Sequence, residues 1–315
     1  MKEFYTKSLG EQIHQQIDGT LLFGATSFID LILAAFFSHG HVLVEGPPGT
    51  AKTMTAKLLA HLLAKSFKRI QFTTDMLPGD ILGAHVYLPA ASEFKFLPGP
   101  IFSEFIVADE INRTPPRTQS ALLEAMEERQ VTLEGKSYPL GHDFFVLATQ
   151  NPHDYEGTFP LPEVQLDRFL FKLVVGHGSP ETESQILRGI LSGSLPPDLT
   201  KIKPITVDWK KVALEADAVV LDDSLVRFIT VILAQTRNHP LIVAGASVRG
   251  GIGLARSARI TALLEGRDFV TPDDIKRLTL PVMRHRIKLN PEAQISNISA
   301  ENVIEEILKK VEFPK

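Results

Sequence analysis

Residues 46–53 of this 315-residue chain read Gly46-Pro47-Pro48-Gly49-Thr50-Ala51-Lys52-Thr53. A short apolar run at 41–45 precedes this loop, and apolar residues with helical spacing follow it over 52–64. A strand, a glycine-rich loop and a helix in this order are typical of a phosphate-binding loop, whose backbone N–H groups surround the phosphates. We expect Lys52 to contact the β- and γ-phosphates of ATP and the Thr53 hydroxyl to bind Mg²⁺.

The loop departs from the common pattern at one position. Glycine usually stands directly before the lysine, whereas this chain has Ala51 there and an additional glycine at Gly49. The extra methyl group is tolerable if Ala51 has the helical dihedral angles expected in the first turn of a helix. Residues 46–53, with Met54 beside them, are therefore predicted to bind ATP. The loop alone also fits an ordinary glycine-rich turn with a solvated lysine.

Short apolar runs alternate with helical segments from His41 to about Gly176. The runs are too continuous for a half-exposed antiparallel sheet, so they predict a buried and mostly parallel sheet. The predicted strands are 41–45, 69–73, 105–109, 144–149 and 169–175, and the predicted helices are 3–18, 25–38, 52–64, 117–127 and 162–166. This order is typical of a doubly wound α/β core, which binds ligands at the carboxyl ends of its strands.

The remaining segments predict a hairpin and a second domain. Apolar and polar residues alternate over 129–140 around a glycine turn, which predicts a two-stranded hairpin inserted before the fourth core strand. The Ser179-Pro180 pair is a helix-start signal after the last strand. We therefore predict an α/β domain over 1–178 and a small all-helical domain over 179–315. Its expected helices are 223–235, 247–264 and a helix that begins after Thr271.

Polar side chains follow two of the predicted strands. The run 105–108 ends in Asp109 and Glu110. Asp109 can hold Mg²⁺ through its water shell, and Glu110 can polarise a water molecule for attack on the γ-phosphate. Asn151 follows the next strand, where its amide can hydrogen-bond the attacking water or the phosphate. By themselves, the two acids also fit a solvated strand end, and Asn151 fits a turn before proline.

Two arginines at helix ends are further candidates. Arg168 stands where a helix meets the last predicted strand, and Arg249 lies in the first turn of the helix that follows Ser247. Either guanidinium suits the charge that develops on a transferring phosphoryl group. A surface ion pair is the alternative for both, with the neighbouring Asp167 as the partner of Arg168.

Composition limits the other classes of function. The 33 Lys and Arg residues against 37 Asp and Glu give a net charge of −4, which offers no overall attraction to nucleic acid or to an anionic membrane. The chain has no cysteine, so disulfides and thiolate chemistry are excluded, and a cytoplasmic location is expected. The apolar stretch 31–37 is too short to span a bilayer, so no membrane insertion is expected.

In several stretches the chain resembles the AAA+ ATPases, and more closely the MoxR group of that superfamily. The resembling stretches include the loop at 46–53, Asp109-Glu-Ile-Asn-Arg-Thr-Pro-Pro and its continuation to Thr132, Ala148-Thr-Gln-Asn-Pro152, Glu156-Gly-Thr-Phe-Pro to Phe169, and Gly245-Ala-Ser-Val-Arg-Gly250. They follow one another in the order found in the family and cover most of the chain. The resemblance implies a P-loop core followed by a helical lid.

The resemblance also implies roles for single residues. Asp109 and Glu110 would be the Walker B pair, Asn151 the sensor 1 residue and Arg249 the sensor 2 arginine. Arg168 would be an arginine finger that reaches a neighbouring subunit's nucleotide, which requires a homo-oligomeric ring, commonly a hexamer. Gly24 would mark the segment near the adenine. Such proteins are ATP-driven chaperones that remodel partner complexes, often beside proteins with von Willebrand factor A domains.

Other functions fit the same residues. A DNA motor that uses the hairpin at 129–140 is one alternative, although Glu134 beside Lys136 at its tip leaves no basic run for nucleic acid. A magnesium-chelatase motor subunit is another, and the residues do not distinguish it. A third is an ATP-gated scaffold with little turnover. A binding module has no need of Glu110, however, so hydrolysis is the prediction we prefer.

Overall fold

The computed structural model describes residues 4–18, 26–47, 52–89, 92–151, 157–176 and 179–313. Its centre is a five-stranded sheet in the order β2-β5-β8-β1-β9, in which every neighbouring pair is parallel. The strands are β1 (Val42–Glu45), β2 (Phe67–Gln71), β5 (Phe105–Asp109), β8 (Phe145–Gln150) and β9 (Phe171–Val174). The predicted parallel α/β sheet is confirmed, with strand ends that differ from the predicted ones by at most two residues.

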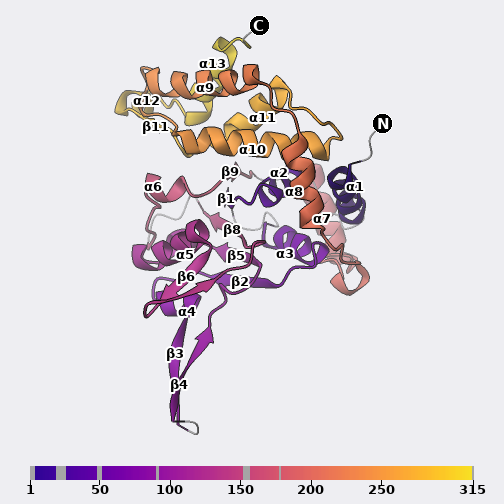
Figure 1. Cartoon of the computed structure of the whole chain (residues 1–315), viewed down its shortest axis with the longest axis vertical. Coiled ribbons are helices and arrows are strands. Elements are labelled where there is room, and N and C mark those ends of the chain that lie inside the picture. The colour runs from indigo at the N-terminus through magenta and orange to yellow at the C-terminus, as the bar shows by residue number, and fades with distance from the viewer. Residues whose placement is uncertain are drawn as a thin grey trace.

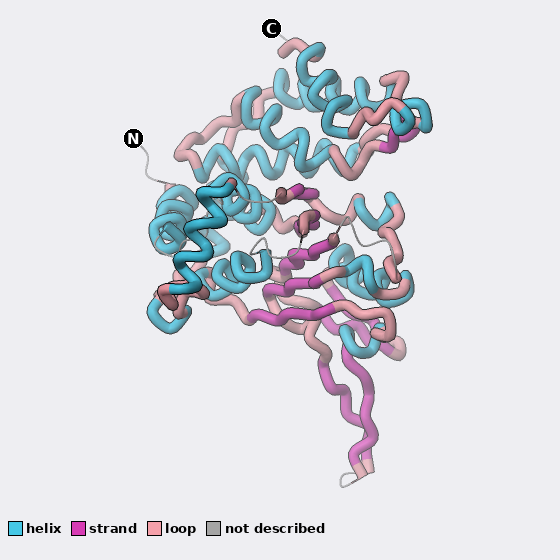
Figure 2. Tube along the Cα trace, turned by 180° about the vertical axis from the view of Figure 1, so that it is seen from behind, coloured by secondary structure: helices cyan, strands magenta, loops and turns pink. Residues whose placement is uncertain are grey.

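Both faces of the sheet are buried, which explains the continuous apolar runs in the sequence. Alternate side chains of a strand point to opposite faces, so Val42 and Val44 belong to one hydrophobic cluster while Leu43 belongs to another. The helices α2 (Thr26–Phe37) and α3 (Lys52–Leu62) cover the first face, and α5 (Pro116–Glu128) covers the second. Figure 2 shows helices on both sides of the stacked strands.

Two hairpins extend the core. The strands β6 (Gln130–Leu133) and β7 (Lys136–Pro139) pair antiparallel at the predicted place. The strands β3 (Gly83–Leu88) and β4 (Glu93–Pro98), which the sequence analysis did not predict, follow the short helix α4 (Pro78–Leu82) and project from the core on the side away from the C-terminal helices (Figure 1). The hairpins pack on each other through Phe96 and Tyr138, whose stacked rings have centroids 4.5 Å apart.

The residues from 179 onward, here called the lid, are mainly helical. The helices are α7 (Pro180–Leu191), η2 (Leu199–Lys201), α8 (Trp209–Ala218), α9 (Asp223–Asn238), α10 (Val248–Leu264), α11 (Pro272–Met283), α12 (Pro291–Ile295) and α13 (Ala300–Lys310). The side chains of Ser179 and Thr271 cap α7 and α11 as predicted, whereas the Ser247 hydroxyl makes no capping bond to α10. The expectation of an all-helical lid misses a two-stranded antiparallel sheet, β10 (Ile242–Ala244) with β11 (Lys288–Leu289).

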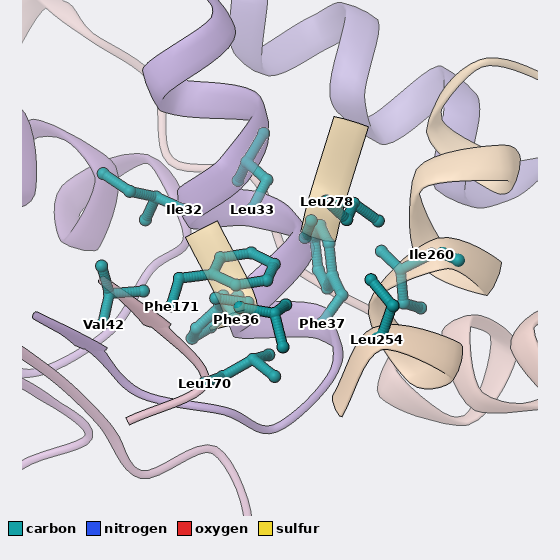
Figure 3. Packing of buried hydrophobic residues seen from close by; sticks show 14 of the residues in the cluster. Ile32, Leu33, Phe36, Phe37, Val42, Leu170, Phe171, Leu254, Ile260 and Leu278 are labelled. Carbon is teal, nitrogen blue, oxygen red and sulfur yellow. The ribbon is translucent and has the colours of Figure 1, made fainter. Parts of the chain in front are cut away.

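The helix α2 joins the sheet to the lid through one hydrophobic cluster. Its residues Ile32, Leu33, Phe36 and Phe37 pack between the strand residues Val42 and Phe171 on one side and the lid residues Leu254, Ile260 and Leu278 on the other (Figure 3). The first helix, α1 (Tyr5–Asp18), contacts α8 and α10 of the lid. Within the described ranges, no helix has the length and apolar character needed to cross a membrane.

Candidate functional site

The described part of the phosphate-binding loop lies at the carboxyl end of β1. Gly46 follows the strand, and a Cβ atom there would lie 2.4 Å from the carbonyl oxygen of Val175, so glycine is required for the close approach of the segment that follows β9. Lys52 and Thr53 are the first residues of α3. Pro48, Gly49, Thr50 and Ala51 lie outside the described residues, as does Gly24.

Lys52 is folded back onto its own loop. Its Nζ atom donates hydrogen bonds to the carbonyl oxygens of Gly46, at 2.9 Å, and Pro47, at 2.7 Å. Burial lowers the pKa of Lys52, and the nearby carboxylates of Asp109 and Glu110 act in the opposite direction. A lysine that donates hydrogen bonds to neutral carbonyl groups can exchange them for phosphate oxygens, whose negative charge makes a stronger hydrogen bond.

Asp109 is the buried centre of the site, at 7% exposure. Its Oδ2 atom accepts hydrogen bonds from the Thr53 hydroxyl, at 3.2 Å, and from Nε of Arg69, at 2.8 Å. Its Oδ1 atom accepts a hydrogen bond from the Thr149 hydroxyl at 2.6 Å. The Thr53 hydroxyl and the Asp109 carboxylate are hard oxygen donors side by side, which is the donor type that Mg²⁺ prefers.

Glu110 turns out of the strand at the residue after β5. It has φ 58° and ψ 49°, a left-handed conformation that is uncommon for residues other than glycine and that stores strain of about 1–3 kcal/mol. Its N–H donates a hydrogen bond to the Thr149 hydroxyl at 3.0 Å. Its Oε2 atom accepts one from Nε2 of Gln71, at 2.7 Å, and lies 3.2 Å from Nε of Arg113. The carboxylate is therefore held in a defined position at the strand end.

Asn151 lies at the same edge of the sheet. It follows the last residue of β8, is half-buried, and β8 stands between β5 and β1 in the sheet. The structure therefore brings Lys52, Thr53, Asp109, Glu110 and Asn151 to one edge, as parallel strands that end together require.

Arg168 and Arg249 lie at the opposite edge. Arg168 precedes β9, whose first residue, Phe171, pairs with the first residue of β1. The three residue steps of β1 separate this edge from the phosphate-binding loop by about 10 Å of strand. Nε of Arg168 lies 2.9 Å from Oε2 of Glu127, and Nη2 of Arg249 pairs with Oε1 of the same carboxylate. The partner of Arg168 is therefore Glu127 and not its sequence neighbour Asp167.

Four residues of the two edges were missed by the sequence analysis: Arg69, Gln71, Thr149 and Glu127. Arg69 and Gln71 alternate along β2, and the register of β2 with β5 places Gln71 opposite Asp109. Their alternation with apolar neighbours in the run 69–73 is a signal that two polar side chains share one face. Thr149 is the last residue of the predicted strand 144–149, and threonine is common in strands, so its hydroxyl gave no separate signal.

Two models of known protein families match parts of this chain. The model of the ATPase family associated with various cellular activities (AAA) matches residues 41–171, and the AAA lid domain model matches residues 234–307. Chaperone MoxR1 of Mycobacterium tuberculosis is 39% identical over 94% of this chain and 80% of its own length. The chain belongs to the MoxR family of AAA+ ATPases.

Two further proteins are similar over nearly the whole chain. The uncharacterized protein YeaC of Bacillus subtilis is 45% identical over 93% of this MoxR-family chain and 92% of its own. A crystal structure of a protein from Cytophaga hutchinsonii, assigned as an ATPase, has a TM-score of 0.89 and 38% identity, and the match covers 98% of this chain and 97% of that one. The expected family and the expected core with its lid are confirmed.

Proposed function

We propose that this MoxR-family protein hydrolyses ATP in a Mg²⁺-dependent reaction. The observation that supports this most directly is the pair Asp109 and Glu110 at the end of β5, with Thr53 bonded to Asp109 and Glu110 held separately by Gln71. Two adjacent carboxylates with different partners suit two different tasks, of which one is to hold a metal ion and the other is to activate water.

Each residue at this edge has one role in the proposal. Lys52 and the backbone of 46–54, which includes Met54, bind the phosphates of ATP. The Thr53 hydroxyl and Asp109 hold Mg²⁺, which when bound neutralises charge on the phosphates. Glu110 accepts a proton from the attacking water, and Asn151 orients that water or the γ-phosphate through its amide.

The arginines at the opposite edge lead us to propose a homo-oligomeric ring. Arg168 and Arg249 share Glu127 at the amino ends of the strands, whereas Lys52 lies at the carboxyl ends. Because the sheet separates them, we propose that both arginines contact the nucleotide of a neighbouring subunit.

We further propose that hydrolysis is coupled to remodelling of a partner protein complex. The name of the relative MoxR1, a chaperone, supports this role. The lid and the sheet share one hydrophobic cluster through α2. A movement of the lid that follows hydrolysis of a neighbouring subunit's nucleotide is therefore transmitted to the core of the same subunit. A client complex with a von Willebrand factor A domain protein stays a prediction from the family resemblance.

The test is the variant Glu110→Gln. Mg²⁺-dependent phosphate release should fall at least ~100-fold, the loss typical when a general base is removed, while the affinity for a fluorescent ATP analogue changes less than about threefold. Glu292→Gln, a change of the same kind at an exposed position in α12, is the control and should keep full turnover. Phosphate release that is equal in Glu110→Gln and the parent would contradict the proposal. Capture of client proteins by the ATP-bound Glu110→Gln variant, absent with ADP, would test the remodelling role.

A further inference from the structure

Glu127 stands at a position that is unfavourable for an acidic residue. It lies in the last turn of α5, where the partial negative charge of the helix C-terminus repels a carboxylate, and that turn contains no basic residue. Helix stability therefore does not explain this side chain. Its two oxygens each pair with a different guanidinium, Oε2 with Arg168 and Oε1 with Arg249, so its position is explained by these arginines.

The arginines belong to a cavity with more positive than negative charge. This cavity, about 250 Å³ in volume, lies where the lid meets the core. Its described lining includes the two carboxylates of Glu127 and Asp167, and the five guanidinium groups of Arg129, Arg168, Arg249, Arg256 and Arg286. Five positive charges against two negative charges leave an excess of three, which suits a polyanion such as the triphosphate of a nucleotide.

The arginines of this cavity differ in their freedom to change partners. The side chain of Arg286 is 3% exposed and is fixed by Asp167, whose Oδ1 atom lies 2.7 Å from Nε of Arg286. The side chains of Arg168 and Arg249 are 24% and 49% exposed, and that of Glu127 is 32% exposed. Two guanidinium groups at the cavity rim can therefore be approached from solvent, and both pair with the single carboxylate of Glu127. Nη1 of Arg249 also lies 4.0 Å from Oδ2 of Asp167.

We propose that Glu127 takes the place of the γ-phosphate of a neighbouring subunit's nucleotide in the free subunit, and releases Arg168 and Arg249 to that phosphate when subunits assemble. The inference rests on the proposed ring. A carboxylate and a phosphoryl group both accept paired hydrogen bonds from guanidinium groups, so the exchange keeps each arginine paired in both states. Glu127 thereby keeps the two arginines ordered in the free subunit and opposes assembly without ATP.

The exchange predicts a specific effect of the charge on Glu127. Glu127→Gln keeps the size of the side chain and removes the charge that competes with phosphate. In the Glu110→Gln background, which prevents turnover, the protein concentration for half-assembly in saturating Mg²⁺–ATP should fall about 3- to 10-fold, the range for two partly exposed ion pairs. With ADP, which has no γ-phosphate, assembly should stay as weak as in the background variant.

Sedimentation velocity over a range of protein concentrations measures this effect. Glu128→Gln is the matched control, because it removes the same charge from the next residue, which has no ion pair to another described residue. Glu127→Ala removes the carboxylate without introducing an amide that could hydrogen-bond the arginines, and it should shift assembly in the same direction. If Glu127→Gln leaves the ATP-dependent assembly unchanged, or shifts it equally with ADP and in the Glu128→Gln control, the role of Glu127 is refuted. If the background variant itself does not assemble with ATP, the ring proposal fails first, and this inference fails with it.

Discussion

The ion pair between Asp167 and Arg286 connects the core to the lid, and its removal should destabilise the whole chain. Arg286 follows α11, and Asp167 lies between α6 (Glu163–Leu166) and β9. Besides its contact with Asp167 at 2.7 Å, Arg286 donates hydrogen bonds to the carbonyl oxygens of Phe169, at 2.6 Å, and Leu170, at 3.0 Å. The perturbation we consider is Asp167→Ala.

The structure sets the size of the expected loss. Burial lowers the pKa of Arg286, and Asp167 opposes this effect, so the carboxylate compensates for the cost of burying the guanidinium. Removal of one partner of a buried ion pair typically costs about 3–5 kcal/mol. The carbonyl acceptors remain in the variant, and the side chain of Asp167 is 26% exposed, so we expect a smaller loss of about 2–3 kcal/mol in the free energy of unfolding.

Urea unfolding followed by far-UV circular dichroism measures the loss. The control is Glu163→Ala, because Glu163 also joins the core to the lid, through Lys288 at 2.6 Å, but both side chains are more than half exposed. Its cost should stay below about 1 kcal/mol. The double variant Asp167→Ala/Arg286→Met should be more stable than Asp167→Ala alone, because it buries no unpaired charge. Equal losses in the two single variants would refute the reasoning.

Two further changes test the site and the pH dependence. Thr149→Val deprives both Asp109 and the Glu110 N–H of a hydrogen-bond partner, so phosphate release should fall about tenfold or more while Thr149→Ser keeps most of it; equal rates in the two variants would contradict this. Burial lowers the pKa of His41 from 6.5 to about 3, so its contribution to stability is complete above pH 6.5 and is lost as the pH falls toward 3. The free energy of unfolding measured in urea should therefore decrease by up to about 1.4 kcal/mol per pH unit for this residue in that window, and His41→Gln should have a visibly smaller slope.

The sequence predicted the elements whose pattern is enforced by burial. The strand Phe105–Asp109 was predicted with its exact bounds because all five of its residues are buried between apolar layers. The hairpin Gly83–Pro98 was missed because most of its residues are exposed, so no apolar face is imposed on its strands. The strands Ile242–Ala244 and Lys288–Leu289 are too short for any periodicity to be recognised.

The candidate site likewise has residues that the sequence could predict and contacts that it could not. Lys52, Asp109 and Asn151 could be predicted to lie together because each stands at the end of a strand or the start of a helix, and parallel strands end at one edge. The contacts of Arg69 and Thr149 with Asp109 join residues 40 positions apart in the chain. A pairing of this kind depends on sheet order and register, which local sequence does not specify.

The placement of the arginines depends on the same sheet order and has a functional consequence. The sequence contains a complete set of residues for phosphoryl transfer, yet the fold places Lys52 and Glu110 at one edge of the sheet and Arg168 and Arg249 at the other. If both arginines serve the reaction, each subunit contributes residues to two different active sites, and neither site is complete without a neighbouring subunit. Turnover per subunit should then rise with protein concentration until the ring is formed, and the charge on Glu127 affects the protein concentration at which the ring forms in ATP. Turnover that is fast and independent of concentration in a monomer would show that the arginines serve only to join the lid to the core.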